Sequence, residues 1–172
     1  MVTKVKEGKI EASTESFKQL IKFNPKDKQI MKVQYNNLYT HFVLITYNRL
    51  PLIEEKHRNR VEKYITGVIS NNDCHLYSIY ANPDHMHMLI SRSPTMDEET
   101  LATIIANSSS KFINENKLCL GNFTWQDSCS AFSVSKKDID KVCKYILNQK
   151  EHHKKQSFAQ EYDAFIKFYQ SK

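Results

Sequence analysis

Glycine is scarce in this chain: only three of its 172 residues are glycine. Gly8, Gly67 and Gly121 lie too far apart to form a GxGxxG fingerprint or a phosphate-binding P-loop, so a glycine-loop nucleotide site is not expected. Long apolar runs are also absent, and none approaches the roughly 20 residues that a membrane span needs. No signal-peptide pattern opens the sequence. We therefore expect no membrane partner.

Paired cysteines are missing as well. The four cysteines are isolated and form no CxxC pair: Cys74, Cys119, Cys129 and Cys143. Isolated thiols suit a reducing compartment better than a disulfide framework or a zinc ribbon. This cysteine usage is typical of a cytoplasmic protein.

The net charge of +6 is unevenly distributed. Residues 1–35 carry eight lysines against four acids, and residues 136–172 carry nine lysines against five acids. Residues 36–135 carry eight basic and ten acidic side chains. Basic proteins bind nucleic acid more often than others do, although many bind none. The charge alone therefore raises the odds of a nucleic-acid partner only modestly.

Two regions can be distinguished along the chain. Residues 1–35 look like an N-terminal extension of unknown role, with a short amphipathic helix in 10–23 that Asn24-Pro25 would end. Residues 36–172 carry the regular pattern of a folded domain.

The pattern in this second region predicts an α+β domain. It favours strands at 38–47, 75–81, 85–91 and 131–134, and helices at 54–71, 95–116, 136–153 and from Ser157 onward. A Thr95-x-x-Glu98 capping box is expected to open the second helix. The order β-α-β-β-α-β is the ferredoxin-like split βαβ arrangement. Right-handed crossovers would place both helices on one face of a four-stranded antiparallel sheet and leave the other face open.

The third predicted strand carries a pair of histidines, His85 and His87. Residues i and i+2 of a strand point to the same face, about 6.6 Å apart, so the two imidazoles could converge on one divalent cation. Met86 and Met88 would face the helices. The alternative is that both histidines are ordinary polar residues on a solvated face. His41, in the first strand, could assist them, although a structural role is the better interpretation.

Tyr145 and Gln149 share one edge of the predicted helix at 136–153. The buried stripe of this helix is formed by Ile139, Val142, Cys143 and Ile146, and Tyr145 lies at its border. Taken alone, such a tyrosine is more often a partly buried packing residue. Beside a divalent cation that polarises a phosphodiester, its hydroxyl could attack phosphorus.

The two motifs together resemble the single-tyrosine HUH transposases of the insertion sequence 200-like group. The motifs are His85-Met86-His87 and Tyr145-Ile146-Leu147-Asn148-Gln149, and the flanking segments Pro83-Asp84, Asn107–Phe112 and Trp125-Gln126 agree with them. The resemblance implies that residues 36–172 are an HUH transposase domain ending in a catalytic tyrosine helix.

The resemblance also implies a mechanism. Tyr145 would attack single-stranded DNA at hairpin ends and form a 5′-phosphotyrosine, while His85, His87 and Gln149 hold Mg²⁺ or Mn²⁺. A homodimer is expected, in which the tyrosine helix acts in trans. Candidate DNA contacts are Arg49, Arg92, Lys111, Lys141 and Lys144, each of which could instead be a solvated surface charge.

Two other functions stay open. The first is a domesticated transposase or nuclease of the REP-associated type, which would use the same chemistry on a host repeat. The second is a ferredoxin-like module that binds nucleic acid without catalysis.

Overall fold

The computed structural model describes residues 31–154 and 158–170. The chain divides into two compact units, residues 1–34 and residues 35–172. The helix predicted at 10–23 and the predicted cap at Ser157 lie outside the described residues.

The centre of the second unit is a four-stranded antiparallel sheet in the order β2-β3-β1-β4. The strands are β1 (Tyr39–Ile45), β2 (His75–Ala81), β3 (His85–Ser91) and β4 (Ser130–Val134). In β1 and β3, Val43 pairs with His87 and Ile45 with His85. The predicted α+β fold, with four antiparallel strands and with strands one and three as neighbours, is confirmed.

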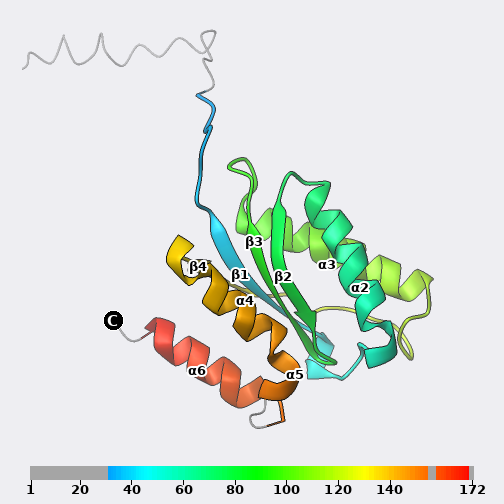
Figure 1. Cartoon of the computed structure of the whole chain (residues 1–172). Coiled ribbons are helices and arrows are strands. Elements are labelled where there is room, and N and C mark those ends of the chain that lie inside the picture. The colour runs from blue at the N-terminus through cyan, green and yellow to red at the C-terminus, as the bar shows by residue number, and fades with distance from the viewer. Residues whose placement is uncertain (1–30, 155–157, 171–172) are drawn as a thin grey trace, which may run out of the picture. The chain divides into compact units, whose positions relative to one another are not determined.

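Two helices, α2 (Glu55–Ser70) and α3 (Glu98–Glu115), cover one face of the sheet (Figure 1). Met86 and Met88 of β3 are fully buried on this side, packed in one cluster with Ile65 and Ile105. Because side chains alternate along a strand, this packing sends His85 and His87 to the opposite face.

The start of α3 differs from the prediction. Asp97 is the N-cap, and its carboxylate accepts a hydrogen bond from the Thr100 backbone amide at 2.7 Å. Thr95 instead contacts Ser93, so the predicted Thr95–Glu98 capping box is wrong. Both Asp and Thr are favoured N-caps, and here Asp97, the residue directly before the first turn of α3, takes the N-cap position.

The second face of the sheet is covered by α4 (Ile139–Leu147), α5 (Gln149–His152) and α6 (Phe158–Gln170), as Figure 1 shows. The expectation of an open face is therefore wrong. The single helix predicted at 136–153 is also divided, into a short 3₁₀ turn (Lys136–Asp138), α4 and α5, with the interruption at Asn148.

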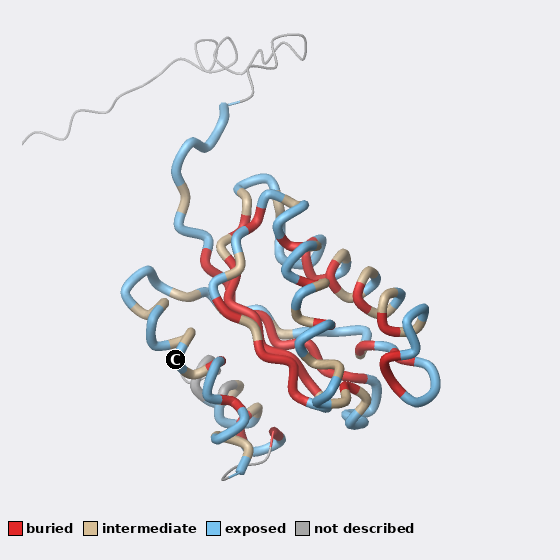
Figure 2. Tube along the Cα trace, turned by 45° about the vertical axis from the view of Figure 1, so that its right-hand side comes forward, coloured by how far each residue is buried: buried red, intermediate tan, exposed pale blue. Residues whose placement is uncertain are grey.

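Burial on both faces explains why β3 is almost wholly inaccessible. Six of its seven residues are buried, and the buried positions run along the central strands in Figure 2.

None of the helices in the described part of the chain is long and apolar enough to cross a membrane.

Candidate metal and nucleophile site

His85 and His87 lie at the start of β3. In each of them, one ring nitrogen is within hydrogen-bond distance of a neighbouring side chain. Asp84 Oδ1 lies 2.6 Å from His85 Nδ1. His41 Nε2, on β1, lies 3.0 Å from His87 Nδ1. The backbone around Asp84 is fixed in turn, because the Thr46 amide donates to the Asp84 carbonyl at 2.9 Å. Both histidines therefore direct Nε2 away from these Nδ1 contacts, on the covered face of the sheet.

Glu161 of α6 and His153, directly after α5, approach these two nitrogens. His153 Nε2 lies 3.1 Å from His85 Nε2 and 3.2 Å from Glu161 Oε2. Glu161 Oε1 lies 3.5 Å from His87 Nε2. We call His85, His87, His153 and Glu161 the histidine–glutamate cluster. It joins one strand with two segments that are distant from it in the sequence.

Gln149 lies at the edge of this cluster and is fully buried. Its amide nitrogen donates to Glu161 Oε1 at 2.9 Å, and its Oε1 accepts a hydrogen bond from Asn82 Nδ2 at 3.2 Å. The same Asn82 nitrogen lies 2.9 Å from His85 Nε2. Gln149 is thus linked to His85 through Asn82 and to His87 through Glu161, and its amide oxygen accepts from Asn82.

Burial dominates the electrostatics of the cluster. It lowers the pKa of His87 well below the ordinary value, and the nearby histidines lower it further. Burial also lowers the pKa of His41 to about 4. It raises the pKa of Glu161 to about 7, with the charge of Asp84 as a second cause. Neutral imidazole is the form that binds metal ions.

Two atoms of the cluster have no hydrogen bond among the described residues, although both are buried: His87 Nε2 and Glu161 Oε2. Such atoms are costly unless something satisfies them. Imidazole nitrogens and carboxylate oxygens are good ligands for divalent ions such as Mn²⁺. The donor set therefore fits a divalent cation, as the family resemblance implies.

Tyr145 lies on α4 directly beside the histidines of its own chain. Its ring centroid is 5.7 Å from that of His87, 6.2 Å from that of His41 and 5.6 Å from that of His152. The expected nucleophile and the expected histidine ligands therefore lie side by side within a single chain.

Contacts of Phe158 and Arg49 hold the start of α6 against this site. The Phe158 ring stacks on His85 with 3.8 Å between centroids and an interplanar angle of 19°. The Arg49 guanidinium lies over Phe158 and Tyr162, at 5.6 and 6.0 Å from the ring centroids. Arg49 is a predicted DNA contact, and the structure places it beside Phe158 and Tyr162, at the edge of the site.

The other candidate DNA contacts are scattered. Lys141 and Lys144 are exposed on α4, the helix that carries Tyr145. Lys111 is exposed on α3, on the other side of the sheet. Arg92 is buried, and its guanidinium donates to Thr40, Met96 and Glu98. These bonds make Arg92 a link between β1 and the start of α3, which does not favour a DNA contact.

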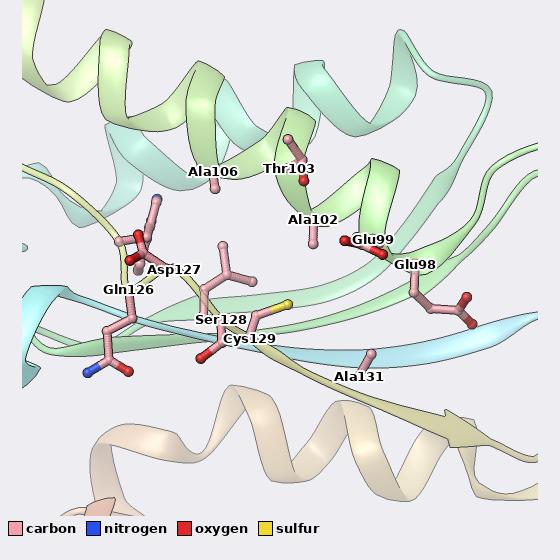
Figure 3. A pocket seen from close by; sticks show the side chains of 12 residues that line it. Glu98, Glu99, Ala102, Thr103, Ala106, Gln126, Asp127, Ser128, Cys129 and Ala131 are labelled. Carbon is pink, nitrogen blue, oxygen red and sulfur yellow. The ribbon is translucent and has the colours of Figure 1, made fainter.

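A separate concavity of about 390 Å³ lies between α3 and the segment that enters β4. Its lining includes Glu99, Trp125 and Cys129, and no residue of the histidine–glutamate cluster (Figure 3).

Sequence reasoning missed His153 and Glu161 as members of the site. Glu161 follows Phe158 by three residues and precedes Tyr162, so it interrupts the apolar side of α6 with an acid. An acid at such a position is a signal of a buried polar partner.

Comparison with known proteins gives a family and a fold. A family model described as "Transposase IS200 like" matches residues 34–149. No curated protein matches the chain. A protein assigned as a transposase from Deinococcus radiodurans R1 has a similar structure, with a TM-score of 0.53, 17% identity, and coverage of 69% of this chain and 96% of that one. A REP-associated tyrosine transposase bound to a REP hairpin gives a TM-score of 0.53, 16% identity, and coverage of 72% and 74%.

Proposed function

Because the chain belongs to the IS200-like transposase family, we propose that it cuts and rejoins single-stranded DNA through a covalent intermediate on Tyr145. One observation carries the proposal: the Tyr145 ring lies 5.7 Å from that of His87, beside a buried cluster suited to a divalent cation. A polarised phosphodiester and a nucleophile would meet at this point.

In the proposed step the Tyr145 oxygen attacks the scissile phosphorus. The new O–P bond forms as the bond from phosphorus to the 3′ oxygen breaks. The tyrosine loses its proton, and the departing 3′ oxygen gains one. The DNA 5′ end remains on Tyr145. Attack by another 3′-hydroxyl reverses the step and rejoins DNA without ATP, because the phosphotyrosine keeps the bond energy.

The tyrosine hydroxyl needs help, since its ordinary pKa of about 10 makes it a poor nucleophile. A divalent cation, Mg²⁺ or Mn²⁺, would supply Lewis-acid polarisation of the phosphodiester. His85, His87 and Gln149 would hold it. Asp84 and His41 orient the two imidazoles through their Nδ1 atoms.

The proposed substrate is a single strand with a hairpin end. It is supported by the solved relative that is bound to a REP hairpin. The same relative supports a second candidate function, in which the chain processes a host repeat in place of an insertion-sequence end. Binding competition between hairpins from the two kinds of source separates these candidates.

The arrangement of Tyr145 bears on the oligomer. The family resemblance predicts a homodimer with the tyrosine acting in trans. Within one chain, however, Tyr145 already lies beside its own His87. We therefore propose that it acts in cis, whether or not the protein is a dimer.

The test is covalent capture of DNA by the full chain. Single-stranded hairpin oligonucleotides, labelled at either end, are incubated with Mg²⁺ or Mn²⁺ and resolved on denaturing gels. The wild type should retain the 3′-labelled fragment and release the 5′-labelled one. Tyr145→Phe should do neither, and His87→Ala should lose cleavage while still binding the hairpin.

The control is Tyr77→Phe, which changes an exposed tyrosine on β2 and should behave as the wild type. Cutting by Tyr145→Phe would show that the nucleophile is another residue. Hairpin binding by a wild type that never forms an adduct would favour the non-catalytic binding module.

A further inference from the structure

We propose that Glu161 and His153 bind the same divalent cation as His85 and His87, so that α5 and α6 complete the metal site. This inference rests on the proposed function and deepens it. Neither residue lies in the segment 34–149 that the family model matches.

The spacing of the donor atoms supports this assignment. Ligands at adjacent corners of an octahedron, with bonds of about 2.1 Å, lie about 3 Å apart. The contact from His85 to His153 is 3.1 Å, and the contact from His153 to Glu161 is 3.2 Å. One donor atom from each of these three residues lies within 4.8 Å of the others. One ion can therefore reach all three after small adjustments.

The unsatisfied atoms provide a second, independent observation. His87 Nε2 and Glu161 Oε2 are buried and lack a hydrogen bond among the described residues. His87 is 1% exposed and Glu161 is 3% exposed. A cation between them would satisfy both atoms, whereas without an ion, within the described part of the chain, Glu161 Oε2 has only the ion-pair contact with His153 and His87 Nε2 only the one with Glu161 Oε1.

Packing holds Glu161 in place. Phe158, three residues before it, stacks on His85, and Tyr162, one residue after it, hydrogen-bonds to Ser130 of β4 at 2.6 Å. Gln149 donates to Glu161 Oε1 and so orients the carboxylate. Contacts of this kind commonly position metal ligands. The start of α6 therefore presents Glu161 to the histidines in a fixed geometry.

The enlarged donor set has a consequence for metal choice. Mg²⁺ prefers oxygen ligands and retains water, whereas imidazole nitrogens favour transition ions. Three imidazoles and one carboxylate therefore favour Mn²⁺ over Mg²⁺. Without His153 and Glu161, the set of two imidazoles and one amide would discriminate less between Mn²⁺ and Mg²⁺.

The test measures Mn²⁺ binding to the full chain by calorimetry and by Mn²⁺ electron paramagnetic resonance, without DNA. Glu161→Gln keeps the size of the side chain and removes the anionic donor, and it should weaken Mn²⁺ binding about 10- to 100-fold. His153→Gln should act in the same direction. The Mn²⁺-dependent rise in melting temperature should shrink in both variants. The wild type should bind Mn²⁺ at least about tenfold more tightly than Mg²⁺.

Matched controls are Glu151→Gln on α5 and Asp163→Asn on α6, which change exposed acids on the same two helices. Both should bind Mn²⁺ as the wild type does. Melting in metal-free buffer verifies that each variant is folded.

The outcomes separate this inference from the proposed function. If Glu161→Gln binds Mn²⁺ as tightly as the wild type, or more tightly, while His87→Ala does not bind it, Glu161 is not a ligand and the inference fails alone. The proposed function fails separately if Tyr145→Phe still forms the DNA adduct.

Discussion

The imidazoles of His41 and His87 are hydrogen-bonded to each other across neighbouring strands, with 3.0 Å between His41 Nε2 and His87 Nδ1. Both rings are buried. When His87 donates its Nδ1 proton to His41, its Nε2 keeps a lone pair directed toward Glu161. This is the usual arrangement of a metal-binding histidine, whose second nitrogen donates to a fixed acceptor. His41 is thus a positioning residue for His87.

Replacing His41 by Ala should therefore weaken Mn²⁺ binding about 10- to 100-fold, because His87 loses the acceptor that fixes its ring. His41→Gln, which retains an acceptor, should recover part of the affinity. Hairpin binding should change little in either variant. Calorimetry with Mn²⁺ and gel-shift titration with the hairpin give the two readouts. His75→Ala, at an exposed histidine of β2, serves as the control, and equal affinities for all the variants would exclude a positioning role.

Lys141 and Lys144 should contact DNA phosphates, because both are exposed on the helix that carries Tyr145. The double variant Lys141→Gln/Lys144→Gln should reduce the slope of log K against log salt by about 1.4, or about 0.7 for each lost contact with a single strand. Fluorescence anisotropy with a labelled hairpin at several salt concentrations measures this slope. Lys56→Gln/Lys63→Gln on α2 removes the same charge from the other side of the sheet and should leave the slope unchanged.

Mixing two inactive variants distinguishes action in cis from action in trans. Tyr145→Phe and His87→Ala chains, combined and allowed to exchange, should form no DNA adduct, because each chain lacks one half of its own site. The measurement is adduct formation on a denaturing gel, with wild type mixed with either variant as the control. Recovered adduct formation in the mixed sample would mean that one chain supplies the tyrosine and its partner supplies the histidines.

The Ser109–Trp125 hydrogen bond should contribute to the stability of the fold and not to catalysis. The buried Trp125 Nε1 donates to Ser109 Oγ at 2.9 Å, and Ser109 donates to the Ile105 carbonyl at 2.6 Å. Ser109→Ala leaves the indole nitrogen without that acceptor and should lower the free energy of unfolding by about 1–3 kcal/mol. Urea unfolding measures this loss, and Ser108→Ala is the neighbouring control. A strong loss of adduct formation per folded molecule would argue against a purely structural role.

The strands could be predicted from the sequence because their signals are local. Alternation along β3 separates methionines from histidines, and Asn82-Pro83-Asp84 marks the turn before it. Both predicted strands in this region have the predicted bounds, His75–Ala81 and His85–Ser91. The Tyr145–Gln149 spacing likewise brings both residues to the site, although the helix between them is interrupted.

The packing of α6 over the histidines could not be predicted in the same way. Whether α6 packs on the sheet depends on contacts between distant segments, such as Phe158 against His85. No local pattern links Glu161 to His87, and the resemblance implied no role for Glu161 or His153. The sequence therefore predicts two histidines and an amide as ligands, whereas the structure places a third imidazole and a carboxylate beside them.

The interruption at Asn148 separates two elements that a continuous helix would move together. Tyr145 belongs to α4, which packs on β2 and β3, and Gln149 begins α5, where its side chain is bonded to Asn82 and Glu161. A tilt of α4 about Asn148 would carry the tyrosine, and any strand attached to it, without pulling Gln149 from its partners. In the proposed strand exchange, such independence would let the attached 5′ end meet a new 3′-hydroxyl while the ion-binding geometry stays constant.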